Sequence, residues 1–348
     1  MMNPVSARLL SQQLICQQFT SPNDVVDWMG AVQAQDYRMM RWAVEMRSVR
    51  PSAKAFEKAY NSGLIVRTHL FRTTWQLVSG TDWHWMLALC RDSALRGLAG
   101  WMKSNGVSIP RAEQERVHGV FADCLSVNRI AQKADFDAAL KDRGILMDDH
   151  RLSYHIRLAE YSGLLCSGDL FPQKHSYALA EDKLPKAFPF SRDESLGLLA
   201  RKYYRSHGPA TLEDFVWWSG LNKKDCKRGM DAIREELVER TWKGRPFFLH
   251  KDSRTRGMRS GTLMLLPPYD EYLIGYKSRA VVLHPDHAHH AHNNRGIFKP
   301  VVALDGEIVG NWLPLSEDGA LNVFRQGVQI PAELFARKLS EYRKAHQR

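Results

Sequence analysis

The stretch Leu152-Ser-Tyr-His-Ile-Arg-Leu-Ala-Glu-Tyr161 carries apolar side chains at helical spacing, and Gly163 follows it as a helix stop. A further helix is predicted before it, through Phe136–Leu140. After it, Leu164–Leu170 and Ser176–Leu179 have the pattern of a β-hairpin. Helices followed by a two-stranded ribbon are typical of a winged helix, so this region predicts one such unit.

The same order recurs on both sides of this region. Downstream, Gly208-Pro209 interrupts a helix and Thr211 is placed to cap the next one. The predicted elements there are helices at 196–207, 212–219 and 223–236 and strands at 237–242 and 245–249. Upstream, they are two helices within 3–32, a helix at 51–60, extended segments at 64–70 and 71–78, and a helix from 81 onward. Residues 42–46 fit a helix or a strand.

The carboxyl-terminal part has a different texture. Short apolar segments at 262–266, 281–283, 300–304 and 308–312 predict strands, and Asp305-Gly306 predicts a hairpin turn. The expected fold class is therefore α+β, with tandem winged-helix (helix-turn-helix) units followed by a small C-terminal β domain. The predicted divisions are 1–103, 110–190, 191–258 and 259–348.

The charge of the chain favours a polyanionic partner. The 348 residues include 49 Lys plus Arg and 38 Asp plus Glu, a formal net charge of +11. Residues 221–260 alone hold 12 basic and 6 acidic side chains, which is +6 of that total. Such a concentration is typical of phosphate binding by a helix-turn-helix unit, although winged helices also serve as protein-interaction units.

Several classes of protein find no support in the sequence. The five cysteines are scattered and never form a C-x-x-C pair, which argues against a disulfide framework or a zinc ribbon. No apolar run approaches the roughly 18 residues of a membrane span, and the first 13 residues lack a signal-peptide core, so a cytoplasmic protein is expected. Phosphate-loop, dinucleotide-binding and nucleophile-elbow motifs are also missing.

A histidine cluster, His284-Pro-Asp-His-Ala-His-His-Ala-His292, raises the alternative of a metal-dependent hydrolase. Pairs of histidines three residues apart suit transition metals on a helix. However, Asp286 is the one carboxylate nearby and an H-E-x-x-H motif is lacking. A solvated loop or short helix is favoured, with no metal, although the role of the cluster stays open.

Two polar stretches are candidates for a site. Gly30-Ala-Val-Gln-Ala-Gln-Asp-Tyr-Arg38 holds Gln33 and Gln35, which share a face on an extended segment but point apart on a helix. If both amides serve one site, the chain must leave the preceding helix before Gln33. Asp36 is adjacent, and its role is open. The second stretch, Arg67–Gln76, places polar groups on a segment that otherwise looks like core, and these groups need partners.

Three passages together resemble the winged-helix DNA glycosylases of the AlkZ and YcaQ type. They are Ala31-Val-Gln-Ala-Gln35, Gly63–Val78, and Leu265-Leu-Pro-Pro-Tyr-Asp-Glu-Tyr-Leu-Ile-Gly-Tyr-Lys-Ser-Arg279 continued through 296–300 and 309–312. The resemblance implies a C-shaped, monomeric enzyme that needs no cofactor and excises alkylated bases from double-stranded DNA, in some members from interstrand crosslinks. The Q-x-Q motif transfers to Gln33 and Gln35. This chain departs from the family at Thr73-Thr-Trp-Gln76, where Gly-Thr-Leu-His is usual, so the role of Gln76 is open.

The hypothesis is a monofunctional DNA glycosylase in which Gln33 and Gln35 orient water against the N-glycosidic bond of a cationic base, N7-alkylguanine or N3-alkyladenine. The alternative is a non-catalytic winged-helix regulator that binds DNA. The residues expected to contact DNA carry cationic or imidazole side chains: Arg38, Arg67, His69, Arg72, Arg254, Arg256, Arg259, Lys277, Arg279, Arg295 and Lys299.

Overall fold

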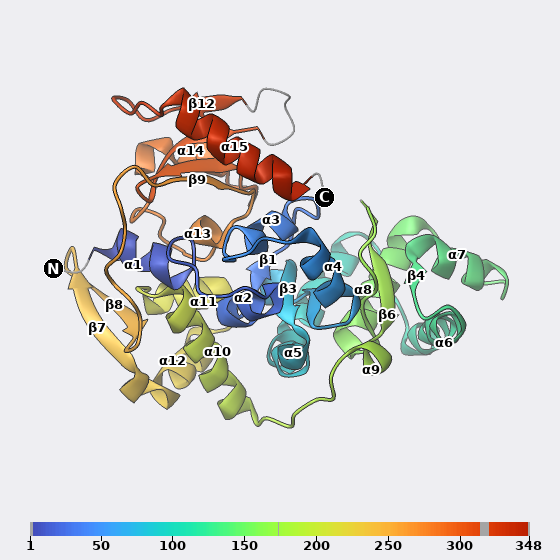
Figure 1. Cartoon of the computed structure of the whole chain (residues 1–348). Helices are drawn as coiled ribbons and strands as arrows, with labels where there is room; N and C mark the ends of the chain where they lie inside the picture. The colour runs from blue at the N-terminus through green and yellow to red at the C-terminus, as the bar shows by residue number, and fades with distance from the viewer. Residues whose placement is uncertain (1–2, 173, 314–319, 347–348) are drawn as a thin grey trace. The chain divides into compact units, whose positions relative to one another are not determined.

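The computed structural model describes residues 3–172, 174–313 and 320–346. Its contacts divide the chain into two compact units: unit 1 comprises residues 1–56 and 196–348, and unit 2 comprises 57–195. Each unit mixes helices with antiparallel strands, as expected (Figure 1). The four divisions expected from the sequence stay a prediction about folding modules.

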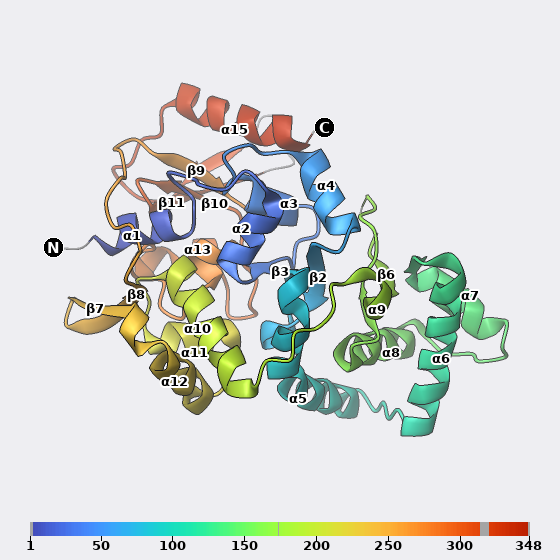
Figure 2. The same ribbon diagram turned by 60° about the horizontal axis from the view of Figure 1, so that its bottom comes forward.

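Unit 2 contains the helix-rich module that the stretch Leu152–Tyr161 predicted. Its elements are α6 (Arg111–Asn128), β4 (Ala131–Gln132), α7 (Lys133–Lys141), α8 (Asp149–Ser162), β5 (Leu165–Ser167), β6 (Ser176–Leu179) and α9 (Ala180–Lys183). The Asp148 side chain caps α8, and Gly163 ends it in the left-handed conformation. Helices α6, α7 and α8 pack with a sheet of order β4-β6-β5 around an apolar core that includes Phe121 and Phe136. Figure 2 shows the three helices grouped with β6.

The rest of unit 2 is built on a hairpin and a long helix. Strand β2 (Ile65–His69) pairs antiparallel with β3 (Trp75–Ser79), and α5 (Gly80–Ser104) follows. The expected strand over 71–78 was therefore partly wrong. Residues Phe71–Thr73 form the short turn η1 instead, and the positive φ angles of Arg72 and Thr73, 55° and 58°, are incompatible with a strand. Helix α4 (Ala53–Asn61) crosses the boundary between the units.

Unit 1 begins with α1 (Pro4–Ser11), α2 (Pro22–Met29), the short strand β1 (Val32–Gln33) and α3 (Met40–Glu45), so residues 42–46 are mainly helical. Its second segment begins within α10 (Arg192–His207) and continues with α11 (Leu212–Ser219), α12 (Lys223–Ala232), the 3-10 turn η2 (Arg234–Glu236), β7 (Leu237–Trp242) and β8 (Arg245–His250). Thr211 and Asp214 form a capping box on α11, and Gly220 ends that helix. The predicted order of three helices and a ribbon is confirmed here.

The carboxyl-terminal part of unit 1 is a four-stranded antiparallel sheet of order β12-β11-β10-β9. Its elements are β9 (Leu263–Leu266), α13 (Glu271–Ile274), η3 (Pro285–His287), α14 (Ala288–Ala291), β10 (Val301–Leu304), β11 (Glu307–Trp312), β12 (Leu321–Val323) and α15 (Ala332–His346). Leu263 and Leu265 pack in the cluster that contains α15, whereas Met264 and Leu266 pack in a second cluster with α13. Burial of both faces explains why β9 is apolar throughout.

Helix α15 lies along this sheet in Figure 1, and neither it nor β12 was expected from the sequence. The strand expected over Val281–Leu283 was wrong. The amides of Val282 and Leu283 donate to the carbonyl oxygen of Arg279 at 3.0 and 2.9 Å, so this apolar run closes a buried turn. Among the helices of the described residues, none is long and apolar enough to cross a membrane.

Candidate functional site

The Q-x-Q segment leaves the helix before its first glutamine. Helix α2 ends at Met29, Gly30 follows with φ of 75°, and Gln33 lies in β1. Gln33 is buried, with 4 % of its surface exposed, whereas Gln35 is exposed in a bend. The two glutamines are therefore not opposed on a helix. The chain leaves α2 before Gln33, as a site shared by the two amides would require.

Gly30 is held closely by its neighbours in unit 1. A Cβ atom at this position would lie 3.1 Å from Cβ of Lys202 in α10 and 3.6 Å from the Trp218 ring in α11. Because the φ angle is also unfavourable for other residues, the turn requires glycine. Helices α10 and α11 thus fix the direction in which the chain enters the Q-x-Q segment.

A buried carboxylate holds the backbone of Gln33. The Gln33 N–H donates to Oε1 of Glu271 at 2.8 Å, and the Trp218 indole N–H donates to Oε2 at 3.1 Å. Nε2 of His207 lies 3.2 Å from the same Oε2. Glu271 is the first residue of α13 and is 1 % exposed. Elements from both ends of the chain therefore meet at this side chain.

His207 lies in surroundings that disfavour the charged form of its ring. Burial lowers its pKa, although the hydrogen bond and the charge of Glu271 act in the opposite direction. A neutral imidazole that donates from Nε2 to the carboxylate leaves Nδ1 as an acceptor, and the Ser206 hydroxyl lies 2.8 Å from Nδ1. The imidazole is thus placed between the Glu271 carboxylate and the Ser206 hydroxyl.

A second polar layer supports α13 from the other side. The Arg47 guanidinium donates to both oxygens of Asp270, at 2.9 and 2.8 Å, and also to Oε1 of Gln12 at 3.1 Å. The Gln12 amide donates to the Glu271 carbonyl oxygen and to the Tyr276 hydroxyl. Asp270 caps α13 through the Tyr272 amide. These contacts fix the helix that presents Glu271.

The passage 265–279 therefore supplies buried residues of the candidate site, Asp270 and Glu271, as well as exposed residues such as Lys277. This passage carries the family resemblance, but Glu271, Asp270, Arg47 and His207 were not predicted as parts of the site. A glutamate directly after an aspartate, in an otherwise apolar segment, was the available signal. Its partners, Gln33 and His207, are 238 and 64 residues away along the chain.

Asp36 has a structural role in the turn after the Q-x-Q segment. Its Oδ1 accepts hydrogen bonds from the amides of Arg38 and Met39, at 2.9 and 3.1 Å. Its carbonyl oxygen accepts from the amide of Met40, where α3 begins. The side chain therefore stabilises the turn into α3, and it does not contact Gln33 or Gln35 in any hydrogen bond identified in the described residues.

Two of the residues expected to contact DNA pack inside unit 2. The Arg67 guanidinium stacks 3.9 Å from the Trp75 ring and lies 3.3 Å from Nδ1 of His175. Nδ1 of His69 lies 2.8 Å from Oε2 of Glu160, and burial lowers the pKa of His69. The side chains of Arg67 and His69 thus have partners within the protein, whereas the buried Thr68 hydroxyl of the same strand has no hydrogen-bond partner among the described residues. Gln76, in the adjacent strand β3, is also buried, and its amide donates to the Thr74 hydroxyl.

The other residues expected to contact DNA lie at the surface. Arg72 and Arg279 are partly exposed, and the rest are exposed: Arg38, Arg254, Arg256, Arg259, Lys277, Arg295 and Lys299. Three of them belong to one loop of unit 1 between β8 and β9. Exposed cationic side chains are available to phosphate, so this set stays a prediction that the structure allows.

The histidine cluster packs partly on an aromatic ring. His290 stacks on Phe324 with 4.7 Å between ring centroids, and His287 lies 5.2 Å from the same ring. Within the described residues, no group of three or more His, Cys, Asp or Glu side chains is arranged to hold a metal ion. The structure therefore offers no positive evidence for the metal-hydrolase alternative.

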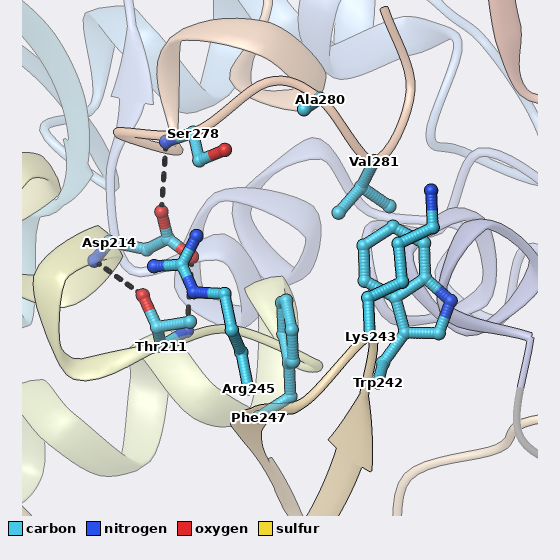
Figure 3. Close-up of a pocket in the computed structure, with 9 residues that line it drawn as sticks. All are labelled: Thr211, Asp214, Trp242, Lys243, Arg245, Phe247, Ser278, Ala280 and Val281. Carbon is cyan, nitrogen blue, oxygen red and sulfur yellow. Dashed lines mark hydrogen bonds between the residues drawn. The ribbon is translucent and has the colours of Figure 1, made fainter.

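A pocket of about 160 Å³ lies in unit 1 beside the tip of the β7–β8 ribbon (Figure 3). Its walls combine aromatic, cationic and polar side chains: Thr211, Asp214, Trp242, Lys243, Arg245, Phe247, Ser278, Ala280 and Val281. Oδ1 of Asp214 accepts from the amides of Lys277 and Ser278, which fixes the loop that carries two residues expected to contact DNA. This pocket was not expected from the sequence.

The chain is similar to known proteins in both sequence and structure. The model of a family described as DNA glycosylase AlkZ-like matches residues 26–341. A Streptomyces sahachiroi protein named "Interstrand DNA cross-link repair glycosylase" is 23 % identical over 343 residues, covering 93 % of this chain and 91 % of that protein. The solved structure of Streptomyces sahachiroi DNA glycosylase AlkZ matches with a TM-score of 0.78 and 20 % identity, covering 99 % of this chain and 96 % of that one. The fold is thus shared along nearly the whole chain.

Proposed function

This chain belongs to the DNA glycosylase AlkZ-like family, whose members hydrolyse N-glycosyl bonds in DNA, and on that premise we propose that it removes cationic alkylated bases. The substrates are N7-alkylguanine and N3-alkyladenine in duplex DNA. Gln33 and Gln35 orient the attacking water. The observation that carries this proposal is the conformation of the Q-x-Q segment, which is extended at Gln33 and held there by Glu271.

The chemistry of a cationic base suits amide side chains. The alkylated base already carries positive charge, so it departs without being protonated, and the sugar becomes oxocarbenium-like in the transition state. The remaining requirements are a correctly placed water and an environment that favours positive charge. The carbonyl oxygen of a glutamine is a hydrogen-bond acceptor that serves both, although it is too weak a base to remove a proton fully.

The different burial of the two glutamines supports a division of roles. Gln33 is buried and its backbone is anchored, so its side chain is confined. Gln35 is exposed in the bend that follows, where DNA and water have access. A confined amide beside an accessible one suits a site that must place a water molecule against a large substrate.

We extend the proposal to interstrand crosslinks. The Streptomyces sahachiroi relative is named as a crosslink repair glycosylase. Such a crosslink joins two bases, and an N7-linked guanine in it carries the same positive charge as a simple N7-alkyl adduct. The same water-orienting glutamines therefore serve both substrates, provided that the site accommodates the second strand.

The test is base release from N7-methylguanine duplexes and from N7-linked crosslinked duplexes. Wild-type protein and Gln33→Ala are measured in parallel under single-turnover conditions. We expect release by wild type and a rate at least about 10²-fold lower for the variant, which is a typical cost of misplacing a reacting group. Intact substrates with wild type, or equal rates for both proteins, would contradict the proposal. Sequence-selective protection of undamaged DNA without base release would favour the regulator instead.

A further inference from the structure

Glu271 is a buried carboxylate held by a backbone amide, an indole and an imidazole. The donors are the Gln33 amide from β1, the Trp218 indole from α11 and the imidazole of His207 at the end of α10. Among the described residues, no Lys or Arg forms an ion pair with Glu271. A carboxylate in such surroundings is costly to bury unless all its donors are correctly aimed.

A carboxylate is a poor choice for packing alone at this position. An apolar side chain of similar volume would avoid the cost of desolvation, but it would remove the hydrogen bonds that the Gln33 amide and the Trp218 indole donate to Glu271. Glu271 instead gathers three donors on two oxygen atoms, and one of them belongs to the backbone of the Q-x-Q motif. The geometry therefore connects a buried charge directly to the residue proposed to orient water.

We propose that Glu271 is a positioning residue for base excision, acting through Gln33. Its Oε1 sets the height and orientation of the Gln33 peptide group, and so the direction from which the Gln33 side chain meets the substrate. His207 and Trp218 hold Oε2 and thereby fix the carboxylate in one rotamer. This inference rests on the proposed function, because it requires that Gln33 takes part in the reaction.

Loss of Glu271 should change the rate of the chemical step and the affinity for DNA differently. Glu271 is 1 % exposed, so it does not contact phosphate itself. Its loss should therefore leave DNA affinity unchanged while the water is misplaced. A displacement of the attacking water by about 1 Å lowers the reaction rate by roughly 10²-fold. A residue that only stabilised the fold would change the melting temperature without this division between rate and affinity.

The experiment compares Glu271→Gln and Glu271→Asp with wild type. The glutamine keeps the length of the side chain but turns one acceptor into a donor, whereas the aspartate keeps the charge and withdraws it from the Gln33 amide. Single-turnover base release and the Kd for the damaged duplex are measured at a temperature below the melting transition. Glu113→Gln is the matched control, since Glu113 also accepts from a histidine, His155, and from Arg151, but lies in unit 2.

We expect both Glu271 variants to release base about 10- to 100-fold more slowly, with a Kd within about twofold of wild type, and Glu113→Gln to keep the wild-type rate. Wild-type rates in folded Glu271 variants would overturn the inference while leaving the proposed function intact. Loss of folding in both variants would also overturn it, because Glu271 would then be a stability residue. Inactive wild-type protein would remove the proposed function and this inference together.

Discussion

The guanidinium of Arg47 and the carboxylate of Asp270 form a fully buried, two-pronged ion pair, with N–O distances of 2.9 and 2.8 Å. Arg47 follows α3, and Asp270 caps α13, which carries Glu271. The pair thus joins the segment after the Q-x-Q motif to the helix that anchors it. Its energetics decide how firmly the candidate site is held.

Replacing Arg47 by alanine should destabilise unit 1 strongly. The substitution leaves the Asp270 charge buried without its partner, and removal of one member of such a pair costs about 3–5 kcal/mol. Denaturant unfolding measures the change. The matched control is Arg143→Ala, whose partner Asp123 is largely exposed, and the free energy of unfolding should barely change in that variant. Equal effects of the two substitutions would contradict the prediction.

Glu45 in α3 should make stability depend on pH with an unusual sign. Burial raises the pKa of Glu45 to about 7, although nearby Arg41 lowers it. Because the folded-state pKa lies above the unfolded value, the contribution is favourable at low pH and is lost as the pH rises through about 7. Glu45→Gln should therefore increase the free energy of unfolding at pH 8, by up to about 3 kcal/mol, and change little below pH 4.5.

Glu236 provides the opposite control for this pH dependence. Its hydrogen bond with Arg201 lowers the pKa of Glu236 to about 2. Its stabilising contribution is present above the unfolded pKa and lost as the pH falls toward 2, so Glu236→Gln should destabilise the protein at neutral pH. Thermal melts of both variants across pH 4–8 provide the measurement. A gain in stability for Glu45→Gln that did not grow with pH would count against the assignment.

Local chemistry was enough to predict much of this fold. The Thr211 N-cap, the Gly163 helix stop and the Asp305-Gly306 turn are determined by the residues that form them, and all three were confirmed. Apolar runs were less informative, because burial alone does not distinguish a strand from a buried turn. The segment 281–283 closes such a turn. Helix α15 was not predicted, although its apolar residues pack on the sheet.

The sequence suggests the Q-x-Q motif as a candidate site, which stays a prediction, but it does not identify the residues that support the motif. Gln33 and Gln35 share a site only if the chain leaves the preceding helix, and the structure places Gln33 in β1 and Gln35 in the bend that follows. The hydrogen bond between Gln33 and Glu271 joins residues 238 positions apart, and no local pattern signals such a contact. Arg67 and His69 illustrate the converse. Their polar groups required partners, and residues of unit 2 supply them.

Exposed arginines in the loop after β8 should govern the salt dependence of DNA binding. Arg256 is exposed, and a phosphate contact by its side chain contributes about 0.9 to the slope of log K against log salt concentration. Arg256→Ala should lower the slope by about that amount for damaged and undamaged duplexes alike. Arg67→Ala is the comparison, and we expect it to leave the slope unchanged because its guanidinium packs on Trp75. A larger change in slope for Arg67 would show that this side chain reaches phosphate.

Gln35 offers the clearest separation of chemistry from stability. Because Gln35 is exposed, Gln35→Ala should change the free energy of unfolding by less than about 0.5 kcal/mol, yet slow base release by roughly 10²-fold if the amide orients water.

Gln35→Asp replaces the amide by a true base. Its rate of base release should therefore rise with pH through the pKa of an aspartate, about 4, and then level off, whereas the wild-type rate should not show this titration. Single-turnover rates between pH 3.5 and 8, limited to conditions where circular dichroism shows the fold intact, measure both effects. A wild-type rate for Gln35→Ala would mean that Gln33 alone places the water, and a flat pH profile for Gln35→Asp would mean that position 35 does not face the reacting sugar.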